Sequence, residues 1–143
     1  MGRLVLFSQA PEATQEIFQL YRRERLLLRD AENKVLGYDH QQIAEALLQH
    51  WKFPVNLVQA ITYHHHPASC PNAREEAAVV HLSDHLVNAM QIGSSGERHV
   101  PPLDALAWHT LHLPLETLSP VMSAVDDQVE AVQDIFLNRA IEA

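Results

Sequence analysis

The fold is decided by residues 36–67, which read LGYDHQQIAEALLQHWKFPVNLVQAITYHHHP. Asp39 is a favourable N-cap, and Gln42 follows three residues later, which is the pattern of a capping box. The apolar residues behind this cap recur at helical spacing and predict one buried stripe: Ile43, Ala44, Leu47, Leu48 and Trp51. The stretch therefore predicts a helix that begins just after Asp39.

A second helix is predicted directly after the first. Lys52-Phe53-Pro54 breaks the first helix, and Pro54 can begin the next one because a proline suits the first helical turn. Its expected buried face consists of Leu57, Val58 and Ile61. Pro67 disfavours helical geometry in the residue before it, so this helix is expected to end near His64 to His66.

The remainder of the chain also reads as helices joined by short breaks. Helical segments are predicted from Pro11 to about Arg25, over Arg29–Leu36, and at about 74–91, 103–110 and 120–141, whereas apolar/polar alternation typical of strands is nearly absent. Glycine, serine and proline over about 93–101 predict a flexible link. We therefore expect an all-α, multi-helix bundle that forms a single domain over residues 1–143.

Composition limits the classes of function. The chain has 143 residues, 47% of them apolar, and a net charge of −8, which disfavours nucleic acid as a partner. No apolar run reaches the roughly 20 residues that a membrane span needs. The single cysteine, Cys70, is expected to be a surface thiol in an exposed loop, and the lack of a second cysteine favours a reducing, cytoplasmic setting. An arginine cluster (Arg22, Arg23, Arg25 and Arg29) is interleaved with Glu24, Asp30 and Glu32, which is typical of a solvated helix face with local charge pairs.

Histidine is the unusual component, with ten residues, as many as lysine and arginine together. Three local groups stand out: Asp39-His40, His64-His65-His66, and His81-x-x-Asp84-His85. Imidazole and carboxylate groups are suitable ligands for a divalent metal, and three consecutive helices could bring these groups together. Each group also has a structural interpretation as a cap, a helix terminus or a hydrogen-bonded core histidine, and spacing alone favours that interpretation.

The order of these elements resembles a known family. The elements are Leu36-Gly37-Tyr38-Asp39-His40, Trp51-x-x-Pro54, Tyr63-His64-His65-x-Pro67 and Val79-Val80-His81-Leu82-Ser83-Asp84. They are similar to the HDOD domain, a bacterial signalling domain of the HD phosphohydrolase superfamily that is related to the HD-GYP cyclic-di-GMP phosphodiesterases. The likeness extends over about residues 1–92.

The resemblance implies which residues would form a metal site. His40, His64, His65 and Asp84 match the family's metal-site elements. Gly2-Arg3 resembles the end of a His-Asp-x-Gly-Arg segment whose His-Asp doublet would precede Met1, so the domain is expected to be truncated at its N-terminus. His66-Pro67-Ala68 also stands where the phosphodiesterases have Gly-Tyr-Pro.

Two functions follow from the resemblance. The favoured one is a non-catalytic signalling and regulatory interaction module, with no catalytic residue and no cofactor, which associates with a protein partner or with itself through exposed apolar surface. The alternative is a metal-dependent phosphohydrolase acting on a phosphodiester or nucleotide, or a degenerate remnant of one. It would hold a single weakly bound divalent metal at an open site formed by His40, His64 and Asp84.

Overall fold

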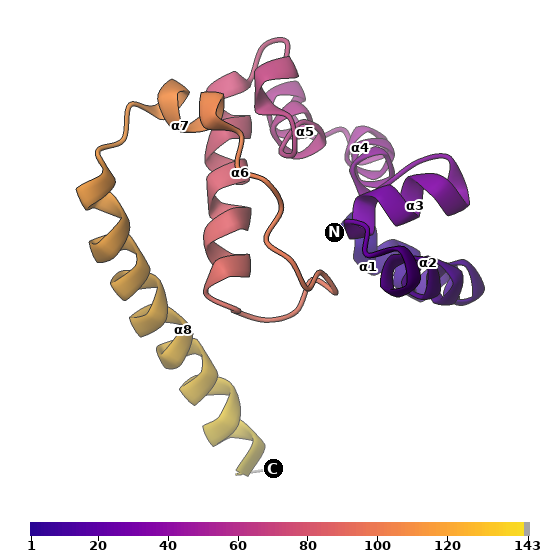
Figure 1. Cartoon of the computed structure of the whole chain (residues 1–143). Helices are drawn as coiled ribbons and strands as arrows, with labels where there is room; N and C mark the ends of the chain where they lie inside the picture. Colours follow the sequence, from indigo (N-terminus) through magenta and orange to yellow (C-terminus); the bar gives the residue numbers. More distant parts are fainter. Residues whose placement is uncertain (142–143) are drawn as a thin grey trace. The chain divides into compact units, whose positions relative to one another are not determined.

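The computed structural model describes the backbone of residues 1–141 and the side chains as far as residue 135, and all regular secondary structure in this part of the chain is helical (Figure 1). The predicted all-α class is therefore confirmed. The helices are α1 (Gly2–Gln9), α2 (Pro11–Glu24), α3 (Leu28–Leu36), α4 (His40–His50), α5 (Val55–Thr62), α6 (Arg74–Ala89), α7 (Ala105–Leu111) and α8 (Leu118–Ile141), with short 3-10 turns at Pro67–Ser69 and Leu115–Thr117. Within the described residues, none of these helices is both long and apolar enough to cross a membrane.

The predicted capping box at the start of α4 is confirmed. The Asp39 carboxylate accepts a hydrogen bond from the backbone N–H of Gln41 at 2.8 Å, and the Gln42 side chain accepts one from the Asp39 N–H at 2.8 Å. Both reciprocal contacts of the box are present. The cap fixes His40 as the first residue of α4.

The described chain divides into two compact units, residues 1–111 and the described residues from 112 onward. In the first unit, α1, α2 and α3 share one apolar core, which contains Leu6, Ile17, Tyr21, Leu28 and Ala31. Helix α4 packs on α1 and on α5, and α6 packs on α5 and α7. The second unit consists of the Leu115–Thr117 turn and α8, which pack on each other.

A long irregular segment joins α6 to α7. It covers residues 91–104, and we call it the strap. In Figure 1 the strap leaves the end of α6, reaches toward the N-terminal helices and returns to α7. Irregular connections longer than about 12–15 residues are uncommon in compact domains and often have a function, and the strap approaches this length.

Three expectations about burial were wrong. Cys70 is a buried thiol that packs with Ala73 and Ala77, not a surface thiol. Trp51 and Leu57, which were assigned to buried faces, are 52% and 44% exposed. The helical period is correct at both positions, but α4 ends and α5 begins there, and both side chains remain exposed at this corner.

Candidate functional site

The ends of α4 and α5 bring three histidines together. His40 is the first residue of α4. Helix α5 ends at Thr62, earlier than expected, so His64 and His65 lie in the turn that follows it. Because α4 and α5 pack together, this turn lies against the first turn of α4.

The resulting cluster is tight. The Nε2 atoms of His40 and His65 are 3.1 Å apart, and one ring nitrogen from each of His40, His64 and His65 lies within 4.8 Å of the other two. His40 and His65 are buried, and His64 is half-buried. The structure thus places three of the four predicted ligands in one group.

The fourth predicted ligand, Asp84, lies nearby but outside that group. It is half-buried on α6 and lines a cavity of about 340 Å³ together with His40 and His64. Arg3, from α1, and Ser95, from the strap, line the same cavity. We call this space the histidine cavity.

A buried carboxylate holds the cluster, and sequence reasoning placed it wrongly. Glu32 was expected on a solvated helix face, but its side chain is fully buried. One carboxylate oxygen accepts hydrogen bonds from the His40 backbone N–H at 3.0 Å and from His40 Nδ1 at 2.6 Å. The other oxygen accepts one from Arg3 Nε at 3.0 Å.

The available signal for Glu32 was its position relative to α3. The buried residues of α3 are Leu28, Ala31 and Glu32. Glu32 therefore lies on the same helical face as the apolar residues Leu28 and Ala31. Burial alone would raise the pKa of Glu32, but the hydrogen bonds and charge of His40, with the charge of Arg3, outweigh it and hold the pKa below its ordinary value. Glu32 is therefore an ionised buried group with two partners.

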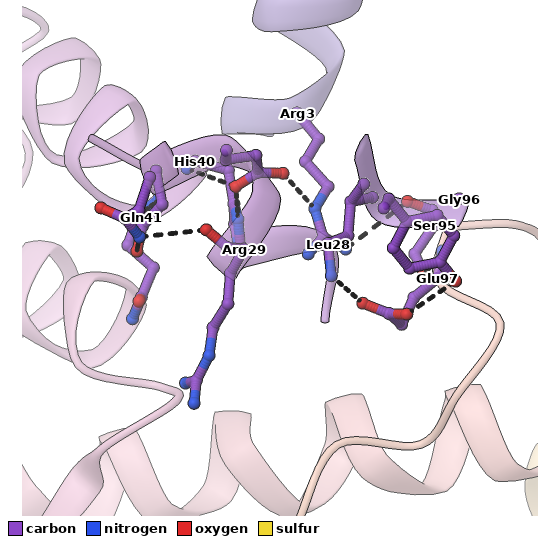
Figure 2. Close-up of polar contacts among 12 residues, drawn as sticks. Arg3, Leu28, Arg29, His40, Gln41, Ser95, Gly96 and Glu97 are labelled. Carbon is purple, nitrogen blue, oxygen red and sulfur yellow. Dashed lines mark hydrogen bonds and ion pairs between the residues drawn. The ribbon is translucent and has the colours of Figure 1, made fainter. Parts of the chain in front are cut away.

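Gly2 allows this arrangement. A Cβ at Gly2 would overlap with the backbone carbonyl oxygen of His40, so only glycine lets α1 approach the start of α4 so closely. The approach brings Arg3 within reach of Glu32. Figure 2 shows Arg3 extending from α1, with a dashed line from its guanidinium to the carboxylate beside His40, whereas the side chain of Arg29 points away.

Hydrogen-bond partners set the tautomers of the cluster. An ionised Glu32 requires a proton on Nδ1 of His40, and in the neutral form of this ring Nε2 then accepts a hydrogen bond from the Nε2–H of His65. His64 Nδ1 donates to the Ile61 carbonyl oxygen at 2.6 Å, so its Nε2 also carries a lone pair. Burial lowers the pKa of His64 to about 4 and lowers the pKa of His65 further, so both rings are neutral at pH 7.

The third histidine group is structural. His81 Nδ1 donates to the His64 carbonyl oxygen at 2.7 Å, and its Nε2 accepts from the Asp104 N–H at 2.9 Å. Burial lowers the pKa of His81, which keeps it in this neutral form. His85 contacts the carbonyl oxygens of His81 and Pro101 at 2.8 and 3.0 Å. These rings hold α6 to the turn after α5 and to the strap.

The donor set fits a single metal ion. Nitrogens of a tetrahedral zinc site lie roughly 3.3 Å apart when the bonds are about 2.0–2.1 Å, which is close to the separation of the His40 and His65 Nε2 atoms. Metal-bound histidines usually donate their other N–H to a carboxylate or a carbonyl group, as His40 and His64 do here. The described group contains no carboxylate, so it does not provide the ligands of a two-metal centre.

Replacing Glu32 tests its structural role. In Glu32→Gln the amide NH2 would face N–H donors of His40 or Arg3, and the guanidinium would lose its counter-charge, so we expect the free energy of unfolding to fall by about 3 kcal/mol. Chemical denaturation measures it. Glu24→Gln, which removes an exposed charge pair with Lys34, is the matched control and should change stability little. Equal effects of the two variants would contradict the assignment.

The lowered pKa of His64 predicts a pH dependence of stability. Its folded pKa is about 4 and its ordinary value is 6.5, so between these values the unfolded chain binds a proton that the folded chain does not. Stability should therefore fall as the pH is lowered from 6.5 to 4, with His64 contributing about 1–2 kcal/mol because its ring is only half-buried. Denaturation curves measured across this range should show a weaker pH dependence in His64→Gln than in His50→Gln. An unchanged dependence in His64→Gln would be inconsistent with the buried neutral ring.

Comparison with known proteins supports the likeness drawn from the motifs. The family model of the HDOD domain matches residues 1–67, slightly less than half of the chain. This segment contains His40, Glu32 and the paired His64 and His65, whereas Asp84 lies beyond it. No curated protein and no solved structure matches the chain. Residues 1–67 are thus similar to the HDOD domain, and this match supports the likeness to the HD superfamily.

Proposed function

We propose that this chain is a non-catalytic signalling module of the HDOD type in the bacterial cytoplasm, which regulates other proteins by association. The observation that carries the proposal is the charge of the histidine cluster. The three side chains close enough to share a metal ion, His40, His64 and His65, are all imidazoles. The neighbouring carboxylate, Glu32, is already paired with His40 and Arg3. Two divalent cations side by side would need bridging or terminal carboxylates to offset their charge, and the positive Arg3 side chain would repel them.

The sequence after the paired histidines supports the same conclusion. His66-Pro67-Ala68 replaces the Gly-Tyr-Pro of the related phosphodiesterases. His65 is also hydrogen-bonded to His40, so this pair stabilises the junction of α4 and α5 without a metal. Cys70 is a free, buried thiol, and a chain with a single cysteine cannot form an internal disulfide, which favours the reducing cytoplasm as its setting.

An apolar surface supports association. We call it the corner patch, and it contains Trp51, Phe53, Val55 and Leu57, which are 52%, 44%, 69% and 44% exposed. The rings of Trp51 and Phe53 lie side by side, with centroids 6.4 Å apart. Adjacent exposed aromatic and aliphatic groups are typical of protein-binding surfaces. We propose that the corner patch binds a protein partner or a second copy of this chain.

Sedimentation of the purified chain tests association between copies. We expect a concentration-dependent dimer that weakens at least about tenfold in Trp51→Ser, because truncating a central aromatic group removes more than 1 kcal/mol of binding energy. Val79→Ser, on an exposed part of α6, is the control and should dimerise as the wild type does. If the chain is a monomer at all concentrations, it does not associate with itself, and the corner patch would bind a different protein. A dimer unaffected by Trp51→Ser would exclude the corner patch as the dimer interface.

A second candidate function is a metal-dependent phosphohydrolase, or a remnant of one, and one observation favours it. The Nδ1 atoms of His40 and His64 are both hydrogen-bonded to oxygen atoms, which leaves the Nε2 atom of each ring as the one that could bind a metal. His40, His64 and His65 would hold the ion, with Asp84 in the same cavity. A bound divalent metal would lower the pKa of a coordinated water and so supply a nucleophile for attack on phosphorus.

Metal loading separates the two functions. The purified chain is incubated with zinc, manganese or iron(II), and bound metal and phosphodiester hydrolysis are measured. The module predicts at most one weakly bound ion and no hydrolysis. The enzyme predicts hydrolysis that is lost in His64→Ala and retained in His50→Ala, whose side chain is exposed at the end of α4. Hydrolysis with that pattern would overturn the module.

A further inference from the structure

The strap joins two groups of helices that otherwise meet mainly through α4 and α5. Its two ends are attached to α6: Ser95 Oγ donates to Asn88 Oδ1 at 3.0 Å, and the His85 ring contacts the Pro101 carbonyl oxygen at 3.0 Å. Its middle lies on the other group, against α1, α2 and α3. Ser94 and Ser95 also line the histidine cavity, so the strap forms part of the cavity wall.

One carboxylate fixes the middle of the strap. Glu97 accepts a hydrogen bond from the backbone N–H of Leu28, the first residue of α3, at 2.7 Å, and another from the Tyr21 hydroxyl at 2.9 Å. The Tyr21 hydroxyl in turn accepts from the Arg98 N–H at 2.6 Å. A carboxylate at the N-terminus of a helix satisfies an unpaired N–H and interacts favourably with the helix dipole. We call this set of contacts the clasp (Figure 2).

The backbone of the strap is shaped for close contact at the clasp. Gly96 has a φ of 81°, and a Cβ there would lie 3.1 Å from the ring of Phe18 and 3.4 Å from the Leu28 side chain. On either side of this contact the strap is exposed, at Gly93, Ser94 and over residues 98–100. A segment held at a few points, with little buried apolar surface between them, opens more readily than the helices that it joins.

Arg3 links the clasp to the histidine cluster. Its Nε donates to Glu32, which holds His40, and its Nη1 contacts the Ser95 carbonyl oxygen at 3.5 Å. The same guanidinium therefore contacts the group that orients His40 and the segment that covers the cavity. A movement of the strap would therefore alter the contacts of Arg3 with Glu32. A change at Glu32 would likewise alter the contact of Arg3 with Ser95.

We propose that the strap is a releasable lid of the histidine cavity, closed by the clasp of Glu97 on Leu28 and Tyr21. Opening the clasp exposes His64 and the cavity, while α6 and the core of α1–α3 stay folded. The inference rests on the proposed function in treating this cavity as the regulated part of the module. It identifies the strap as the element whose opening a partner or ligand would favour.

The test uses Glu97→Gln in the full chain, with two measurements. The glutamine amide has a single oxygen, so it cannot accept from both the Leu28 N–H and the Tyr21 hydroxyl. Backbone hydrogen exchange at Leu28 and at residues 95–98 should therefore become at least about tenfold faster, with exchange in α6 unchanged. The reaction of His64 with diethyl pyrocarbonate, which modifies neutral imidazoles, should accelerate by a similar factor, with exposed His50 as the internal reference. Glu12→Gln, an exposed carboxylate on α2, is the matched control and should change neither rate.

Tyr21→Phe provides an independent variant. It keeps the buried ring and removes only the hydroxyl of the clasp, so it tests the lid even if Glu97→Gln fails to fold. Unchanged exchange at Leu28 and the strap in both variants would overturn the clasp. Faster exchange without faster modification of His64 would show that the strap does not cover the cavity, and would overturn the lid. Neither result depends on metal binding or hydrolysis, so failure of the lid is distinct from failure of the proposed module.

Discussion

The structure around the histidines depends on one buried charge, the carboxylate of Glu32. Its two oxygens face donors on two different helices, Arg3 on α1 and His40 on α4, so a single side chain on α3 fixes three helices relative to one another. A buried carboxylate is stable only when its hydrogen bonds are satisfied, and any displacement of α1 or α4 would leave it unpaired. The position of His40, and with it the cluster, follows from this requirement.

The same contact determines what the cluster can do. With the Nδ1 proton of His40 committed to Glu32, the Nε2 lone pair faces His65, and the two rings form a hydrogen bond without any ion. This is also how a metal ligand is oriented, so the geometry that stabilises a structural histidine pair is the geometry that a metal site would need. What separates the two functions is charge: three imidazoles beside the cation of Arg3 balance less positive charge than the carboxylate-rich centres that hold two divalent metals.

The sequence was sufficient for features that depend on local interactions. The capping box of Asp39 and Gln42, the helical period of α4 and the end of α3 at Gly37 each involve residues within one or two turns, and the structure has them as expected. The resemblance also selected His40, His64 and His65, which lie together. Their role as metal ligands stays a prediction, as does the assignment of residues 1–143 to one domain.

The features that the sequence did not reveal depend on contacts between distant residues. Glu32 looked like one more charge in a charged stretch, because its partner Arg3 lies 29 residues away and its place on the apolar period of α3 was the one local sign of burial. The glycines and prolines of the strap correctly predicted irregular backbone, but composition did not show that Glu97 would reach Leu28, 69 residues earlier in the chain. A segment without helical periodicity is not a helix, but it can still be held in one position by tertiary contacts. Anchors such as Glu97 can give an irregular segment a defined position, and only the tertiary structure identifies them.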